Sequence, residues 1–78
     1  MTMDFDDYII DVVTSNPGYS SSQVCSSLYP NYNTTDKTSA ITIYARVNKH
    51  LAALVRYGIL TREASTRGRL YYQYYLAE

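Results

Sequence analysis

The sequence predicts a mainly α-helical domain that ends in one small β-hairpin, an α+β class. Up to residue 57, apolar residues recur at spacings of three and four, as on one face of a helix. After Gly58 the spacing changes to two, as in a strand. The 78 residues, 46% of them hydrophobic, suffice for one domain with a small core. We therefore expect a single domain over 1–78, built from three helices and a hairpin.

The first two helices are predicted over residues 4–14 and 21–29. Three aspartates stand in the first turn of the first helix, where the positive end of the helix favours them: Asp4, Asp6 and Asp7. A proline and a glycine at 17–18 end this helix. Ser20 or Ser21 is the expected N-cap of the second helix, and Pro30 closes it. A polar loop over 30–37 follows.

The third helix is predicted over residues 39–57, with Thr38 or Ser39 as its N-cap and Gly58 as its end. Its expected core face consists of Ala40, Ile43, Tyr44, Val47, Leu51, Leu54 and Val55. The hairpin is predicted over 59–64 and 69–76, with a turn at 65–68. Two strands are not stable alone, so the hairpin must pack on the helices.

Charge is divided between the two halves of the chain. Residues 1–36 hold five aspartates and no basic residue, whereas residues 37–78 hold all seven basic residues and only two acids. The net charge of zero therefore conceals a dipolar molecule. A local basic face is what attracts phosphate, so the neutral balance does not exclude a nucleic-acid partner.

The order of helices and hairpin is similar to that of winged helix-turn-helix domains. The run Leu51-Ala-Ala-Leu-Val-Arg-Tyr-Gly-Ile-Leu60 resembles the join between recognition helix and wing in those proteins. Arg67-Gly68-Arg69 before paired tyrosines resembles the wing of PadR-like and MarR-like regulators, and Gly18-Tyr19 a PadR-like element. Two departures are an eight-residue loop before the third helix and an extra turn at the start of that helix. Both fall at the end of the domain that would read bases.

The resemblance implies a transcriptional regulator that binds double-stranded DNA as a homodimer. The third helix would enter the major groove, and the hairpin would contact the adjacent backbone or minor groove. The expected DNA-binding residues are Thr38, Ser39, Thr42, Arg46, Lys49, Arg67 and Arg69. For the charged residues among them, a solvated helix face or hairpin tip is the simpler alternative.

A protein-interaction module without DNA binding is the alternative function, since fold does not fix function. The chain has ten tyrosines, and the four in the last strand cannot all face a small core. Tyr8, Tyr71 and Tyr75 are the expected partner surface, unless they only cover a thin core.

An enzyme is not expected. Cys25 and His50, each unique in the chain, lie far apart in sequence, and no phosphate loop or metal-ligand cluster appears. Cys25 is expected to be a small buried apolar group, and His50 a partly buried or surface histidine. We expect no cofactor, no metal and no small-molecule substrate. No apolar run approaches the length of a membrane span, and we expect a cytoplasmic protein.

Overall fold

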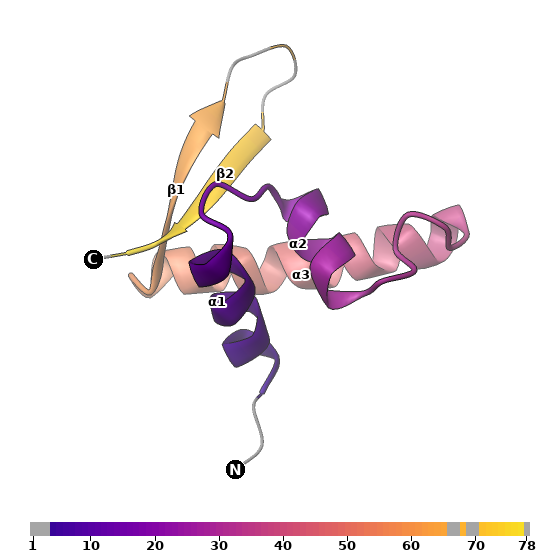
Figure 1. Ribbon diagram of the computed structural model, residues 1–78, viewed down its shortest axis with the longest axis horizontal. Coiled ribbons are helices and arrows are strands. Elements are labelled where there is room, and N and C mark those ends of the chain that lie inside the picture. The colour runs from indigo at the N-terminus through magenta and orange to yellow at the C-terminus, as the bar shows by residue number, and fades with distance from the viewer. Residues whose placement is uncertain (1–3, 66–67, 69–70, 78) are drawn as a thin grey trace.

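The structure is a computed structural model that describes residues 4–65, 68 and 71–77, and it confirms the predicted class (Figure 1). Its elements, in chain order, are α1 (Phe5–Ser15), α2 (Ser21–Leu28), α3 (Lys37–Arg56), β1 (Leu60–Ser65) and β2 (Tyr71–Leu76). The bounds differ from the predicted ones by at most two residues, and the predicted turn and strand residues at 66–67 and 69–70 lie outside the described residues. α1 and α2 pack on α3, and the hairpin rises from the C-terminal part of α3.

Side-chain caps fix where each helix begins. The Asp4 carboxylate accepts from the backbone N–H of Asp7, and the Asp7 carboxylate accepts in return from the N–H of Asp4. Ser20 and Gln23 form the same reciprocal capping box at the start of α2, so Ser20 is the N-cap rather than Ser21.

The predicted N-cap of α3, Thr38 or Ser39, is wrong. Asp36 caps the helix: its carboxylate accepts from the Ser39 backbone N–H at 3.1 Å and from the Ser39 hydroxyl at 2.7 Å. A charged acceptor slightly earlier in the chain satisfies the free backbone donors, so α3 begins at Lys37. These hydrogen bonds hold the pKa of the Asp36 carboxyl below its usual range.

An isolated β-bridge joins the two-stranded hairpin to the connection between α1 and α2. β1 and β2 pair antiparallel, from Leu60 opposite Leu76 to Ser65 opposite Tyr71. On the other edge of β2, the Gly18 N–H donates to the Tyr74 carbonyl and the Tyr74 N–H donates to the Tyr19 carbonyl, both at 2.9 Å. This bridge ties the hairpin to the helices.

The core lies where the three helices meet the hairpin. Its buried side chains are Ile9, Val13, Val24, Cys25, Val47, Leu51, Leu54, Leu60 and Tyr74. α3 supplies three of them, as its apolar spacing predicted. Tyr44, expected on the core face, is instead 39% exposed, because it lies on the flank of α3 that turns toward a cavity. Among the helices of the described residues, none is long and apolar enough to cross a membrane.

Candidate nucleic-acid interface

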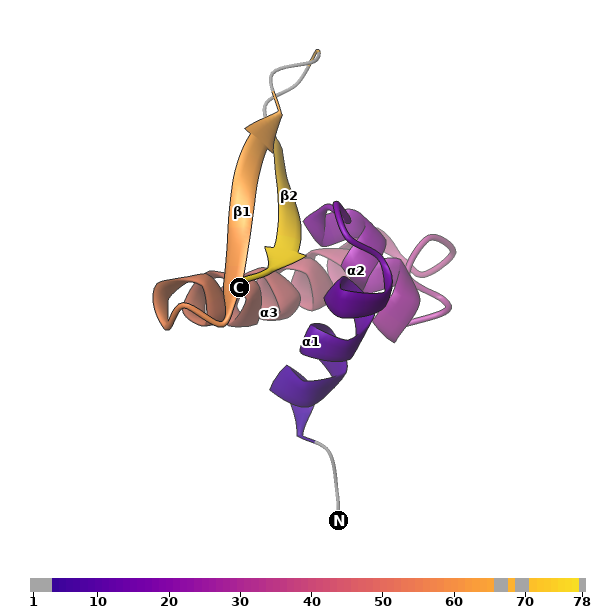
Figure 2. The same ribbon diagram turned by 60° about the vertical axis from the view of Figure 1, so that its left-hand side comes forward.

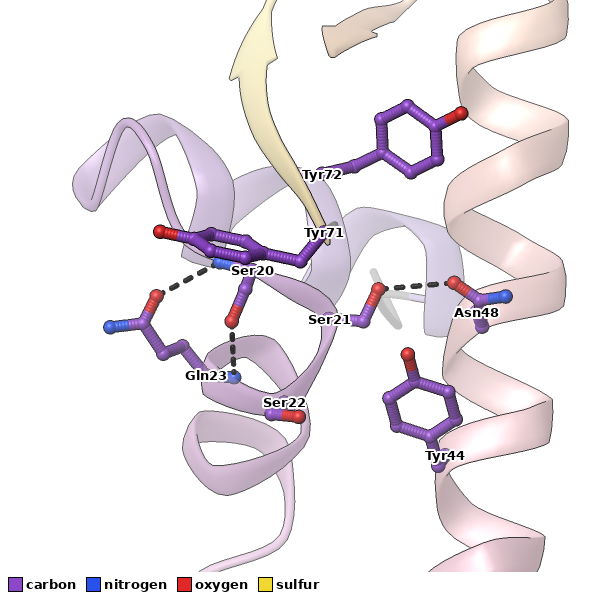
Figure 3. A pocket seen from close by; sticks show the side chains of 8 residues that line it. All are labelled: Ser20, Ser21, Ser22, Gln23, Tyr44, Asn48, Tyr71 and Tyr72. Atoms are coloured by element: carbon purple, nitrogen blue, oxygen red, sulfur yellow. Dashed lines mark hydrogen bonds between the residues drawn. The ribbon is translucent and has the colours of Figure 1, made fainter. Parts of the chain in front are cut away.

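A cavity of about 590 Å³ lies between the start of α2, the middle of α3 and the start of β2 (Figure 3). Its lining side chains are Ser20, Ser21, Ser22, Gln23, Tyr44, Asn48, Tyr71 and Tyr72. Every one of these side chains carries a hydroxyl or an amide, and none of them carries a charge. The cavity therefore offers hydrogen bonds and aromatic surface.

Two hydrogen-bonded contacts hold side chains of the cavity wall in place. The Ser21 hydroxyl donates to Oδ1 of Asn48 at 3.0 Å, linking the first turn of α2 to the middle of α3 (Figure 3). Ser21 is buried, whereas Asn48 is exposed. Beside them, the capping box holds the Gln23 carboxamide against the Ser20 backbone, with its oxygen 2.9 Å from the Ser20 nitrogen. Both amides are thus held in place before any ligand arrives.

A positive charge stands next to the aromatic wall. The Arg62 guanidinium lies 4.2 Å from the ring centroid of Tyr72, a cation–π contact between β1 and β2. No sequence pattern marks Arg62 as a site residue, because a charge on an edge strand is also an ordinary solubility device.

The predicted α3 residues lie outside the cavity. Arg46 lies over the Phe5 ring at 4.6 Å, on the flank of α3 that faces α1. The Ser39 hydroxyl donates to the Asp36 carboxylate, and the Thr42 hydroxyl donates to the Thr38 carbonyl at 3.1 Å. Lys49 is exposed, and Arg67 and Arg69 lie outside the described residues. Their DNA contacts remain predictions.

The Phe5 ring of α1 packs against two residues of α3, Arg46 and His50. Residues four apart on a helix lie one above the other, so Arg46 and His50 flank the same ring. The His50 and Phe5 rings meet edge to face at 4.8 Å, and Nδ1 of His50 lies 2.7 Å from a carboxylate oxygen of Asp6. These contacts attach the start of α1 to α3, and they agree with the expected partly buried histidine.

Only one of the three tyrosines expected at a partner surface lines the cavity. That residue is Tyr71, which is 41% exposed. Tyr8 is half-exposed on α1, and Tyr75 is partly buried with its hydroxyl beside Gly18. Tyr72, which the prediction omitted, takes the place beside Tyr71.

Sequence reasoning missed most of the cavity wall, namely the start of α2, Tyr44, Asn48 and Tyr72. The serine and glutamine at positions 20 and 23 do carry a sequence signal, since this spacing is typical of a capping box. Asn48 carries none, because only the packing of α2 against α3 brings it beside Ser21.

The three acids at the start of α1 lie apart from the hairpin. The N-terminal end of α1, with Asp4, Asp6 and Asp7, points away from the hairpin in both views (Figures 1 and 2). The cavity lies on the hairpin side.

In comparisons with protein-family models, curated proteins and solved structures, the chain matches none of them.

Proposed function

We propose that the protein binds double-stranded DNA with the face around the cavity, as a transcriptional regulator. One observation carries this proposal. Three elements converge on a face of hydroxyl and amide side chains whose described lining includes no acid, while the carboxylates of α1 lie at the opposite end. Serine, tyrosine, asparagine and glutamine side chains are regular donors to DNA phosphate and sugar oxygens.

The dimensions of the elements suit this partner. α3 has 20 residues and therefore a length of roughly 30 Å, and a major groove admits one α-helix. The hairpin stands beside α3 and could contact the backbone next to the groove. The resemblance to winged-helix regulators gives the same assignment, with α3 as the recognition helix and the hairpin as the wing.

The basic residues would supply the sequence-independent part of the affinity. Lys49 and Arg62 are exposed on α3 and β1. Arg67 and Arg69 would add two charges beside Gly68, whose φ of 84° is a backbone conformation that favours glycine. A homodimer would double these contacts and read two half-sites.

A protein partner is the second candidate, and the uncharged aromatic wall favours it. Tyr44, Tyr71 and Tyr72 are each about 40% exposed, and tyrosine is enriched in the cores of protein interfaces. Phosphate has no particular need of such rings, whereas an apolar partner surface packs well against them.

A negative charge placed in the cavity tests the proposal. Ser22 is exposed in the first turn of α2, where a glutamate favours the helix, so Ser22→Glu keeps the fold while repelling phosphate. Thr14→Glu adds the same charge at an exposed position of α1 as a control, and because a glutamate is less favourable in the last turn of a helix, thermal melting of both variants establishes that each is folded. Binding to a labelled random duplex is followed by fluorescence anisotropy at several salt concentrations.

We expect Ser22→Glu to weaken binding at least tenfold at low salt and Thr14→Glu to change it less than twofold. Equal weakening in both variants would contradict the proposed face. Folded protein that binds no duplex at low salt would contradict DNA binding itself and leave the protein partner as the explanation of the tyrosine wall.

A further inference from the structure

We infer that Asn48 is a base-reading residue of this interface, that it prefers guanine, and that Ser21 positions it. The inference rests on the proposed DNA binding and names the residue and the base edge. Asn48 is exposed in the middle of α3 and lines the cavity between α2 and the hairpin. It is therefore on the flank of α3 that faces the same side as the hairpin.

The orientation of the Asn48 carboxamide is set by the protein. Ser21 donates its hydroxyl to Oδ1 at 3.0 Å, and Ser21 is only 8% exposed. The capping box of Ser20 and Gln23 fixes the turn of α2 that carries Ser21. The carbonyl oxygen of the amide is thereby turned toward Ser21, and the amide nitrogen is turned away from it (Figure 3).

This orientation decides which base edge fits. A freely rotating asparagine pairs with adenine through both amide groups, because adenine presents an N7 acceptor beside an N6 donor in the major groove. Here the oxygen is turned toward α2 and accepts from Ser21, so the NH₂ group is the part of the amide that points away from α2. Guanine presents two acceptors, N7 and O6, side by side, and is the edge that a donor group matches.

The neighbouring polar residues of α3 are less suited to the same task. Arg46 is stacked on Phe5, and the hydroxyls of Ser39 and Thr42 already donate to Asp36 and to the Thr38 carbonyl. Holding a side chain before binding reduces the conformational entropy that binding costs. Asn48 is exposed and held in one orientation, and its NH₂ group faces away from Ser21.

Parallel selections from a random duplex pool test the inference. Wild-type protein and Asn48→Ala are each carried through selection, and the base pair at which their preferences differ is identified. Affinities are then measured for duplexes with guanine or adenine at that position. Variants are Asn48→Ala, Asn48→Asp, Ser21→Ala and Ser21→Ala/Asn48→Ala, each checked by circular dichroism and thermal melting.

We expect wild type to prefer guanine over adenine about tenfold, a usual size for one base-edge contact. Asn48→Ala should lose this preference, so that its affinities for the guanine duplex and the adenine duplex become equal. Asn48→Asp keeps an acceptor for the Ser21 hydroxyl but has no donor, so it should lose the preference too. Ser21→Ala frees the whole amide and should shift the preference to adenine.

Ser21 acts through Asn48, so Ser21→Ala should have no effect on base preference in the Asn48→Ala background. Base preferences unchanged by Asn48→Ala, in protein that still binds duplex DNA, would overturn this inference alone. A preference of wild type for a donor edge, such as the cytosine amino group, would overturn the assigned orientation. Absence of duplex binding in every folded form would instead overturn the proposed function.

Discussion

Cys25 shows how burial determines the chemistry of one residue. Its side chain has no exposed surface, and burial raises the pKa of the thiol from 9.0 to about 11. A thiolate is the reactive form of cysteine, so the folded protein keeps this group unreactive at neutral pH. The buried apolar role expected from its place in α2 is confirmed.

Because the thiol has a higher pKa in the folded protein than in the unfolded chain, the free energy of unfolding changes with pH in the alkaline range. Below pH 9 the thiol is neutral in both states, and its full contribution to folding is present. As pH rises from 9.0 toward 11, the unfolded thiol ionises and the folded one does not, so this contribution is lost. We expect the stability difference between wild type and Cys25→Ala to fall by about 2 kcal/mol between pH 8 and pH 10.5.

Urea unfolding of both proteins at the two pH values measures this change. The comparison with Cys25→Ala removes the contributions of all other titratable groups, which are common to both chains. A difference that stays constant with pH would show that the thiol titrates alike in the folded and unfolded states.

Residue identity alone could not distinguish Arg46 from Asn48 as the side chain nearest the cavity. Both stand outside the apolar stripe of α3, and arginine is the more usual base-reading residue. The difference depends on which flank of α3 each partner covers: Phe5 of α1 takes the Arg46 side, and Ser21 of α2 takes the Asn48 side. Such contacts between distant segments leave no periodic signal in the sequence.

At the scale of elements, periodicity predicted α3 well, because its apolar spacing is long and regular. Its start was predicted two residues late, since several capping residues stand close together between positions 34 and 39 and the charged one, Asp36, forms the cap. The bridge between Tyr19 and Tyr74 could not be predicted, because one residue pair is too short for a strand pattern.

The two faces of α3 should differ sharply in their tolerance of truncation. Leu51 is fully buried, and Ile41 is 60% exposed on the same helix. Alanine favours helix at either position, so helix propensity does not separate the two changes. We expect Leu51→Ala to lower the free energy of unfolding by about 3 kcal/mol and Ile41→Ala to change it by less than about 0.5 kcal/mol.

Thermal or urea unfolding followed by circular dichroism gives both values. In a domain of this size, about 3 kcal/mol is a large share of the total stability, so Leu51→Ala should melt at a much lower temperature. Similar destabilisation of both variants would mean that Ile41 is covered in solution, as it would be in a dimer that buries the start of α3.

At the scale of the whole molecule, zero net charge and a DNA partner are compatible only if charge is separated in space. The acids of α1 lie at one end, and the hairpin lies at the other (Figure 1). The two strands carry Arg62 and Glu63, whose charges cancel, so a basic hairpin depends on Arg67 and Arg69 in the segment between the strands. Overall charge is therefore a poor guide to the partner of this chain.

If the protein binds DNA as proposed, the slope of log affinity against log salt should depend on where a removed basic residue lies. Removing one phosphate-binding cation reduces the slope of log affinity against log salt by about 0.9, so Arg67→Ala/Arg69→Ala should make the slope shallower by about two. Lys37→Ala/Arg56→Ala removes the same charge from the two ends of α3 and should change the slope less. Anisotropy titrations from about 50 to about 200 mM salt suffice. Equal slopes in the two double variants would mean that net charge, rather than the hairpin, governs attraction to the duplex.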